Sequence, residues 1–246
     1  MNSPLTPNTL PCFLLAAGRG ERMRPLTDTT PKPLLQIQGK SLLQWHIEAL
    51  VAAHTSRVVI NHAWLGEQIE LALGNGAKWG IQIQYSPEET ALETAGGIRQ
   101  ALPLINPEPY FLVINGDVFC PGFPVTELIS RFEAHLNRGA KPLAYLALAP
   151  NPPQHPEGDF YLQGDRVSDK PINPQSQETK LTFSGIGIYH QSLFKDLQPG
   201  AAAKLAPLLR SAMAENQVFG EKYAGPWHDV GTPQRLYELN QSYDPS

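Results

Sequence analysis

Short runs of apolar residues alternate with longer amphipathic stretches through the first 150 positions of the chain. Residues 12–17, 58–60 and 111–114 are almost wholly apolar, which is typical of strands buried on both faces of a sheet. Residues 81–85 instead alternate apolar and polar side chains, which indicates a strand with one solvated face.

Helical patterns lie between these predicted strands. Ser41 is a suitable N-cap for a helix that ends near Ala53, because apolar residues recur three and four positions apart between them. Similar segments are predicted over 65–73 and from Thr94 onward. This alternation over residues 12–148 predicts an α/β fold, with a Rossmann-like, mostly parallel central sheet and helices on both faces.

The pattern changes after residue 150. A proline-rich loop is followed by apolar residues on both sides of Gln163-Gly164-Asp165, which predicts a hairpin. A strand is expected over 181–189, and helices near 192–196, 205–215 and 233–242. We expect residues 1–11 to form a flexible leader. No later stretch has the composition of a linker, so we expect one domain over 12–246, divided into parts 12–148 and 149–246.

A glycine-rich, cationic loop follows the first predicted strand. Gly18 and Gly20 allow a sharp turn and a close approach of the backbone to a bound group. Arg19, Arg22, Arg24 and Lys32 follow within fifteen residues. Backbone N–H groups with nearby Arg and Lys side chains bind anions well, so the loop is predicted to hold phosphate groups.

Two known phosphate motifs do not fit this loop. Met23 stands where the dinucleotide fingerprint requires its third glycine, and no helix is predicted to open on the loop. The Gly-Lys-Ser/Thr end of a Walker A loop is also missing. A plain solvated surface turn is the remaining alternative, which the cluster of basic residues and Pro31-Lys32-Pro33 disfavours.

Composition excludes several classes of function. The net charge of −4 argues against a nucleic acid as the main partner, which usually leaves a basic footprint. No apolar run approaches membrane-spanning length and no signal peptide is recognisable, so we expect no membrane association. Cys12 and Cys120 lie far apart within apolar runs, so they are interpreted as reduced, buried thiols of a cytoplasmic protein.

Two aspartates stand where a metal ion would be useful beside phosphates. Asp117 ends an apolar strand after Asn115-Gly116, and Asp229 lies in a turn flanked by aromatic residues and glycine. A carboxylate at a buried strand end is costly without a cationic partner. Because Mg²⁺ takes one or two carboxylates and completes its shell with water and phosphate oxygens, the pair predicts a Mg²⁺ site. For each residue a turn or cap role is the alternative.

These motifs together resemble the sugar-1-phosphate nucleotidylyltransferases. The resemblance is carried by Ala16-Ala17-Gly18-x-Gly20-x-Arg22-Met23-x-Pro25-Leu26-Thr27 with Pro31-Lys32-Pro33-Leu34, by Asn115-Gly116-Asp117 and by residues 227–232. It covers the chain after the leader. Residues 59–66, 92–97 and 181–186 look like the uridylyltransferase branch that serves cell-wall recycling. The resemblance implies a GT-A-like fold, here without the C-terminal β-helix of many relatives.

The resemblance implies a role for individual residues. UTP and a sugar 1-phosphate would be the substrates, with Mg²⁺ as cofactor and no obligate protein partner. Residues 12–148 would form the nucleotide-binding core and 149–246 the sugar-binding part. The catalytic residues would be Arg22, Lys32 and Asp117, and the metal ligands Asp117 and Asp229. Nucleotide contacts would come from Ala17, Gly18, Gly20, Glu21, Arg22, Lys32, Glu93, Thr94, Gly96 and Gly97, and sugar-side contacts from Asn115, Asp159, Ser184, Gly185 and Lys204.

Several alternatives stay open at this level. Lys170, in Asp169-Lys170-Pro171, resembles a second essential lysine of some relatives, but the surrounding spacing differs. Uracil and thymine differ by one methyl group, which a pocket discriminates by only about 1–3 kcal/mol. The acceptor could be another sugar phosphate, such as mannose 1-phosphate or glucose 1-phosphate, or choline phosphate. A non-catalytic sensor of nucleotide sugars is a further alternative.

Overall fold

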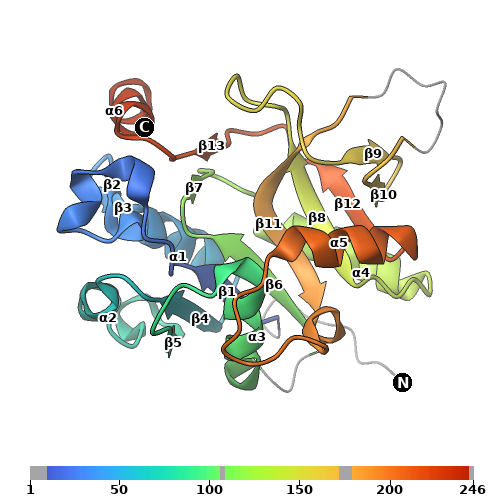
Figure 1. The fold of residues 1–246 in the computed structure, drawn as a ribbon, viewed down its shortest axis with the longest axis horizontal. Helices are drawn as coiled ribbons and strands as arrows, with labels where there is room; N and C mark the ends of the chain where they lie inside the picture. Colours follow the sequence, from blue (N-terminus) through green and yellow to red (C-terminus); the bar gives the residue numbers. More distant parts are fainter. Residues whose placement is uncertain (1–9, 106–108, 172–178, 244–246) are drawn as a thin grey trace.

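The computed structural model describes residues 10–105, 109–171 and 179–243. A nine-stranded sheet runs through the molecule (Figure 1). Its strands, in spatial order, are β5 (Gln82–Pro87), β4 (Arg57–His62), β1 (Cys12–Leu15), β6 (Tyr110–Asn115), β11 (Thr182–His190), β8 (Ala144–Ala149), β12 (Val218–Lys222), β10 (Arg166–Ser168) and β9 (Tyr161–Gln163).

The directions of the strands make this a mostly parallel, mixed sheet. β5, β4, β1 and β6 run parallel to one another, and β8 runs parallel to β12. β11 lies antiparallel between β6 and β8, and β10 lies antiparallel to β12 and β9. The predicted fold class is confirmed, although the pattern of apolar residues did not indicate that β11 enters the sheet in the opposite direction.

Helices cover both faces of the sheet. The apolar faces of α1 (Leu42–Ala52), α2 (Gly66–Leu73) and α4 (Val125–Asn137) share one core cluster with alternate residues of the strands. α3 (Glu93–Ile105) and α5 (Leu205–Ala214) pack on the opposite face. β1 contributes Leu14 to the first cluster and Phe13 to the second, and both side chains are fully buried.

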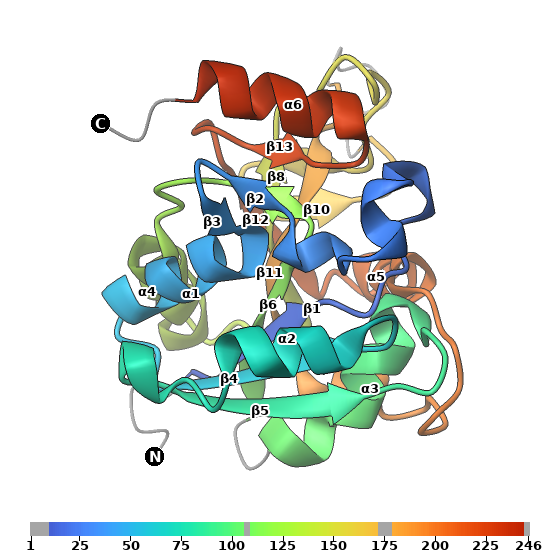
Figure 2. The same ribbon diagram turned by 90° about the vertical axis from the view of Figure 1, so that its left-hand side faces the viewer.

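A third, smaller cluster joins the end of the chain to the segment after β1. α6 (Pro233–Ser242) lies over β13 (His228–Asp229) and the small ribbon of β2 (Gln36–Ile37) and β3 (Lys40–Ser41) (Figure 2). β13 pairs with β7 (Val118–Phe119). Met23, Ile37 and Phe119 are buried in this cluster. Short 3₁₀ turns occupy Glu21–Met23, Leu26–Asp28, Lys32–Leu34, Ala77–Trp79 and Gln191–Phe194.

Most local predictions agree with these elements. The Ser41 hydroxyl accepts the N–H of Gln44 and caps α1, and β9 and β10 form the predicted hairpin. The helix expected near 192–196 is instead a 3₁₀ turn, Gln191–Phe194. Helix α4 and strand β12 were not predicted. The buried residues Val125, Leu128, Ile129 and Phe132 of α4 have the spacing of an amphipathic helix, so this helix could have been found, whereas β12 is short and partly exposed.

The start of the domain and the cysteines can also be compared with expectation. Residues 1–9 of the predicted leader lie outside the described residues. Leu10 and Pro11, which were assigned to the leader, are buried against the domain. Cys12 and Cys120 are free and buried, and burial raises the pKa of both thiols. No helix in the described ranges is both long and apolar enough to cross a membrane.

Candidate nucleotide and phosphate site

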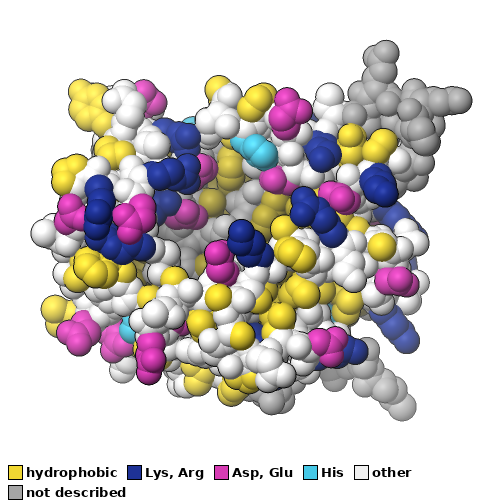
Figure 3. Space-filling model, viewed as in Figure 1, with side chains coloured by type: hydrophobic (Ala, Val, Ile, Leu, Met, Phe, Trp, Pro, Cys, Tyr) yellow, Lys and Arg dark blue, Asp and Glu magenta, His cyan; other side chains and the backbone are white. Residues whose placement is uncertain are grey.

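The carboxyl ends of the central strands meet at one edge of the sheet. Leu15 is in register with Asn61 on one side and with Asn115 on the other, so the residues that follow β1, β4 and β6 lie at one level. This edge is hollowed, and charged side chains gather around the hollow (Figure 3). Ligands of open α/β sheets bind at such edges.

A cavity of about 430 Å³ occupies this edge. It brings together most of the residues predicted to bind the nucleotide, although they come from three separate segments, 17–22, Lys32 and 93–94. The lining residues are Leu15, Ala16, Ala17, Gly18, Gly20, Glu21, Arg22, Met23, Lys32, Pro33, Asn61, Ala91, Glu93, Thr94, Asn115, Asp117 and Gly231.

The glycines of the loop after β1 differ in what surrounds them. A Cβ atom on Gly18 would meet nothing within 4 Å, so this stretch of backbone is open toward the cavity. Gly20 has φ +69°, and a Cβ there would lie 3.0 Å from the Lys32 Cβ atom. Gly20 is therefore required by its left-handed backbone and by the chain packed against it, whereas Gly18 leaves room for a ligand.

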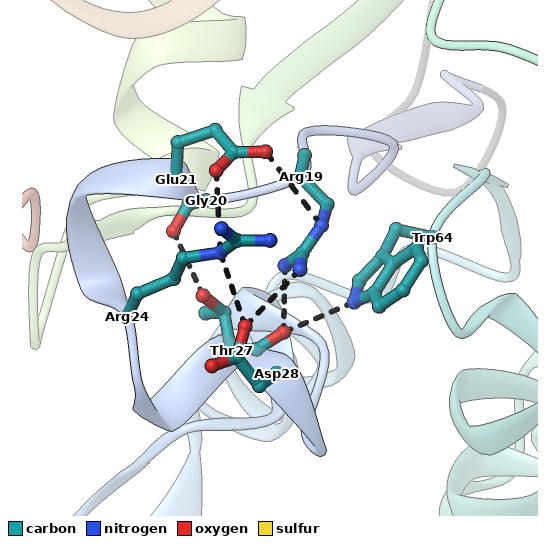
Figure 4. Close-up of polar contacts among 7 residues, drawn as sticks. All are labelled: Arg19, Gly20, Glu21, Arg24, Thr27, Asp28 and Trp64. Atoms are coloured by element: carbon teal, nitrogen blue, oxygen red, sulfur yellow. Dashed lines mark hydrogen bonds and ion pairs between the residues drawn. The ribbon is translucent and has the colours of Figure 1, made fainter.

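The arginines of this loop have different partners (Figure 4). Arg19 donates to the Thr27 carbonyl at 2.7 Å and lies over the ring of Trp64, and the Trp64 Nε1–H group donates to the same carbonyl. Arg24 pairs with Asp28 at 3.0 Å. Both side chains therefore contact other residues of the loop and do not line the cavity. Arg22 lines the cavity, and within the described residues it has no hydrogen bond or ion pair.

Lys32 and Asp117 face each other across the floor of the cavity. Lys32 belongs to the 3₁₀ turn Lys32–Leu34, where Pro31 and Pro33 limit the backbone, and only 7% of the residue is exposed. Its Nζ atom lies 2.6 Å from the Asp117 Oδ2 atom. A buried ammonium group is costly unless it is paired, so the carboxylate compensates the charge of the lysine.

The β7–β13 pairing brings the two predicted metal ligands into one neighbourhood. Asp229 is in register with Val118, the residue after Asp117, and the Val230 N–H donates to the Asp117 carbonyl. Both aspartates line a second cavity of about 230 Å³. The Asp229 Oδ2 atom accepts from Arg235 NH1 at 2.7 Å. Each carboxylate therefore has a cationic partner in this structure.

The donor set fits a magnesium ion better than a metal bound by protein ligands alone. Among the described residues, no group of three or more His, Cys, Asp or Glu side chains could hold a metal ion. Two carboxylates beside an open cavity that also presents Arg22 and Lys32 suit an ion that completes its shell with phosphate oxygens and water.

The second cavity contains most of the predicted sugar-side residues. It is lined by Asn115, Asp117, Val118, Pro152, Gln154, His155, Thr182, Phe183, Ser184, Gly185, Trp227 and Asp229. Gly185 has φ +80°, and a Cβ there would lie 2.7 Å from the Asn115 Nδ2 atom. The Ser184 hydroxyl donates to the Ala147 carbonyl inside the sheet, so its side chain is committed to the fold.

Four predicted site residues do not line either of these cavities. Asp159 accepts from the Phe183 N–H at 2.8 Å and contacts His155, so it holds a wall of the second cavity from behind. Lys204 is exposed at the N-cap of α5. Gly96 and Gly97 are buried in α3, where any side chain would collide with neighbouring atoms. Their predicted contacts with substrates stay predictions.

Sequence reasoning gave no role to two residues that the structure brings to the site, although it placed Asn61 at a strand end. Asn61 lines the larger cavity and bonds to the Ala16 N–H and to Glu88. Arg235 pairs with Asp229. Asn61 had a usable signal, because it directly follows the apolar residues 58–60 near the end of β4, whereas Arg235 lies in an ordinary amphipathic helix and gives no signal.

Comparisons with known proteins identify the family. A family model described as nucleotidyl transferase matches residues 12–245. The N-acetylmuramate alpha-1-phosphate uridylyltransferase of Neisseria meningitidis serogroup B is 50% identical over 228 residues, which cover 92% of this chain and 95% of that protein. The mannose-1-phosphate guanyltransferase of Hypocrea jecorina is 31% identical over 90% of this chain, which spans 61% of that protein.

A solved structure supports the same conclusion for the fold. A protein from Bacillus anthracis described as a glucose-1-phosphate thymidylyltransferase, crystallised with a sucrose, superposes with a TM-score of 0.77. The match covers 96% of this chain and 97% of that one at 20% identity, so it bears on the fold alone. From the matching family model, the relatives and the geometry of the strand ends together, this chain belongs to the nucleotidyl transferase family.

Proposed function

We propose that this enzyme transfers a uridylyl group from UTP to N-acetylmuramate α-1-phosphate, releasing pyrophosphate, as a cytoplasmic step of peptidoglycan recycling. The 50% identity over almost the full length of the Neisseria uridylyltransferase is the observation that supports this reaction most strongly. The two adjoining cavities at the strand ends agree with two substrates that react with each other.

The reaction needs positioning and charge neutralisation more than proton transfer. An oxygen of the sugar phosphate attacks the α-phosphorus of UTP, and the bond from that phosphorus to the pyrophosphate oxygen breaks in line. The attacking group is already an anion, so no general base is required. Preorganised cations and orientation of the two substrates then provide most of the catalysis.

The residues around the larger cavity have roles that follow from their charge and position. The open backbone at Gly18 and the exposed Arg22 would hold the triphosphate. Lys32 would bind the α-phosphate and stabilise the charge that develops there, after exchanging Asp117 for the phosphate as its partner. Glu93 and Thr94, at the far wall, would contact the nucleoside.

Asp117 and Asp229 would hold Mg²⁺, which supplies a template for the two phosphates and a sink for their negative charge. Asn115 and the Ser184-Gly185 backbone line the second cavity and would contact the sugar.

A pyrophosphate-release assay tests the reaction. The protein is assayed with UTP, dTTP and GTP against N-acetylmuramate α-1-phosphate, N-acetylglucosamine 1-phosphate, mannose 1-phosphate and glucose 1-phosphate. We expect the highest kcat/KM with UTP and N-acetylmuramate α-1-phosphate. A higher value for mannose 1-phosphate with GTP would instead favour the guanylyltransferase activity of the more distant relatives, and no turnover with any pair would contradict the proposal.

A further inference from the structure

Glu88 is a buried carboxylate beside the larger cavity that has no role in the reaction described above. It lies directly after β5, and only 5% of the residue is exposed. Burial raises the pKa of this carboxyl group. A buried carboxylate is retained only where hydrogen bonds compensate its lost hydration, so its partners indicate what it does.

Both oxygens of Glu88 accept hydrogen bonds from residues at the edge of the sheet. The Asn61 Nδ2 atom donates to Oε1 at 2.6 Å, and the Leu92 N–H donates to Oε2 at 2.8 Å. Asn61 uses its other end to accept the Ala16 N–H at 2.8 Å. Ala16, Asn61, Glu88 and Leu92 therefore form a continuous chain of hydrogen bonds, called here the Glu88 relay.

The relay joins the two walls of the cavity. Ala16 is the first residue after β1 and begins the glycine loop. Leu92 precedes Glu93, which has φ +60° and lines the opposite wall together with Thr94. The relay connects these two walls from behind the cavity. Of its two side chains, Asn61 also lines the cavity.

Gly97 shows how closely α3 packs against the relay. A Cβ atom at this position would lie 2.6 Å from the Glu88 Oε1 atom and 2.7 Å from the Asn61 Nδ2 atom. Only glycine therefore lets the first turns of α3 approach the two side chains. The packing against Glu88 and Asn61 is therefore enough to explain why position 97 is glycine, and no contact with a nucleotide is needed to explain it.

We infer that Glu88 is a positioning residue for the nucleoside triphosphate. By holding Asn61 and the Leu92 amide together, it sets the separation between the loop that receives the phosphates and the turn that receives the nucleoside. This inference rests on the proposed binding of a nucleoside triphosphate in the larger cavity. Glu88 itself does not line that cavity, so it acts through its two partners.

The direction of each hydrogen bond provides a sharp test. In Glu88→Gln, an NH₂ group replaces one carboxylate oxygen. This group then faces another donor, either the Asn61 amide or the Leu92 N–H. In Asn61→Asp two carboxylates face each other across the former hydrogen bond. The double variant Asn61→Asp/Glu88→Gln restores all three hydrogen bonds, with the donor and acceptor exchanged between positions 61 and 88. The carboxylate at position 61 accepts from the Ala16 N–H and from the amide at position 88, and the oxygen of that amide accepts from the Leu92 N–H. It also keeps one carboxylate.

The experiment measures UTP binding by calorimetry without acceptor, followed by KM and kcat for each substrate. We expect each single variant to weaken UTP binding about tenfold to a hundredfold, the usual effect of losing a hydrogen bond to a charged group. The KM for the acceptor should change much less. The double variant should recover most of the lost UTP affinity. Glu89→Gln, an exposed neighbour, is the matched control and should bind UTP as the unaltered protein does.

Unchanged UTP affinity in Glu88→Gln, or a double variant no better than the two single ones, would overturn the inference. Urea unfolding of all variants separates loss of fold from loss of positioning. If a single variant does not fold, recovery of UTP affinity in the double variant decides the question. Because the binding measurement needs no acceptor, it also distinguishes a failure of this inference from a wrong acceptor in the proposed reaction.

Discussion

Lys32 combines burial, charge and a position at the floor of the larger cavity. The side chain is 9% exposed and that of Asp117 is 39% exposed, so solvent reaches the pair mainly from the aspartate side. The lysine cannot leave its place easily, because Pro31 and Pro33 restrict the backbone on both sides. A fixed ammonium group pointing at a cavity is the arrangement that stabilises charge developing on a phosphate.

Replacing Lys32 with alanine should lower kcat by about 10²–10³-fold, the usual effect of removing one preorganised electrostatic group. The measurement is the rate of pyrophosphate release at saturating substrates. Lys141→Ala is the control, because Lys141 is exposed and lines neither cavity. Near-normal turnover in Lys32→Ala would contradict the role given to this residue.

At the scale of elements, α3 is held against the segment that leads into α5. The Ala95 and Gly96 N–H groups both donate to the Ala203 carbonyl. A Cβ atom on Gly96 would lie 2.4 Å from the Ala201 carbonyl oxygen and 3.0 Å from the Ala203 nitrogen. Gly96 therefore serves the docking of two segments about a hundred residues apart in the chain.

Gly96→Ala should lower the free energy of unfolding by about 1–3 kcal/mol, because backbone atoms must move to admit the methyl group. This is a net loss, because the cost of the collision should exceed the roughly 1 kcal/mol by which alanine is better than glycine in a helix. Gly18→Ala provides the contrast, since its methyl group has open space: unfolding should be unchanged while UTP binding weakens. Urea unfolding and calorimetry measure both. Equal stability of the two variants would contradict this interpretation of α3.

At the scale of the whole molecule, buried histidines couple stability to pH. His46 of α1 is buried, its Nε2 atom has no hydrogen-bond partner, and burial lowers its pKa from 6.5 to about 4. Burial also lowers the pKa of His135 and His190. In the unfolded chain these groups take up protons near pH 6.5, whereas His46 in the folded protein stays neutral until about pH 4.

Stability should therefore fall as the pH drops below about 6.5, because the unfolded state binds more protons. His46 alone should contribute a loss of about 1.4 kcal/mol per pH unit in the middle of this window. The raised pKa of Glu88 acts in the opposite sense at the lower end of the window. Urea unfolding at pH 7.5, 6.5, 5.5 and 5.0 measures the slope. His46→Leu should make it shallower, and an equal slope in both proteins would contradict the assignment.

Site residues that lie together in one short stretch of the sequence were the easiest to predict. Gly18, Gly20, Arg22 and Lys32 lie in one stretch of chain whose residue types already indicate anion binding. Arg19 and Arg24 carry the same signal, yet they pair with neighbouring residues outside the cavity (Figure 4). Residue type alone could not separate the arginine that lines the cavity from the two that stabilise the loop.

The order of strands and helices over residues 12–115 followed from the sequence, because runs of apolar residues and helical spacing depend only on which face of an element is buried. The place of β11 between β6 and β8 did not, because pairing of strands separated by many residues is decided by the packing of the whole sheet.

By itself, the sequence determined that a buried strand ends in a glycine-rich loop with several arginines, and that two aspartates, Asp117 and Asp229, stand in turns after apolar or aromatic residues. Only the tertiary structure decided that Lys32 meets Asp117, that β13 brings Asp229 beside it, and that Glu88 joins the two walls of the cavity. The physical reason is that Lys32 and Asp117, β13 and β7, and Asn61 and Glu88 belong to separate segments of the chain, and only the packed sheet brings them within hydrogen-bonding distance.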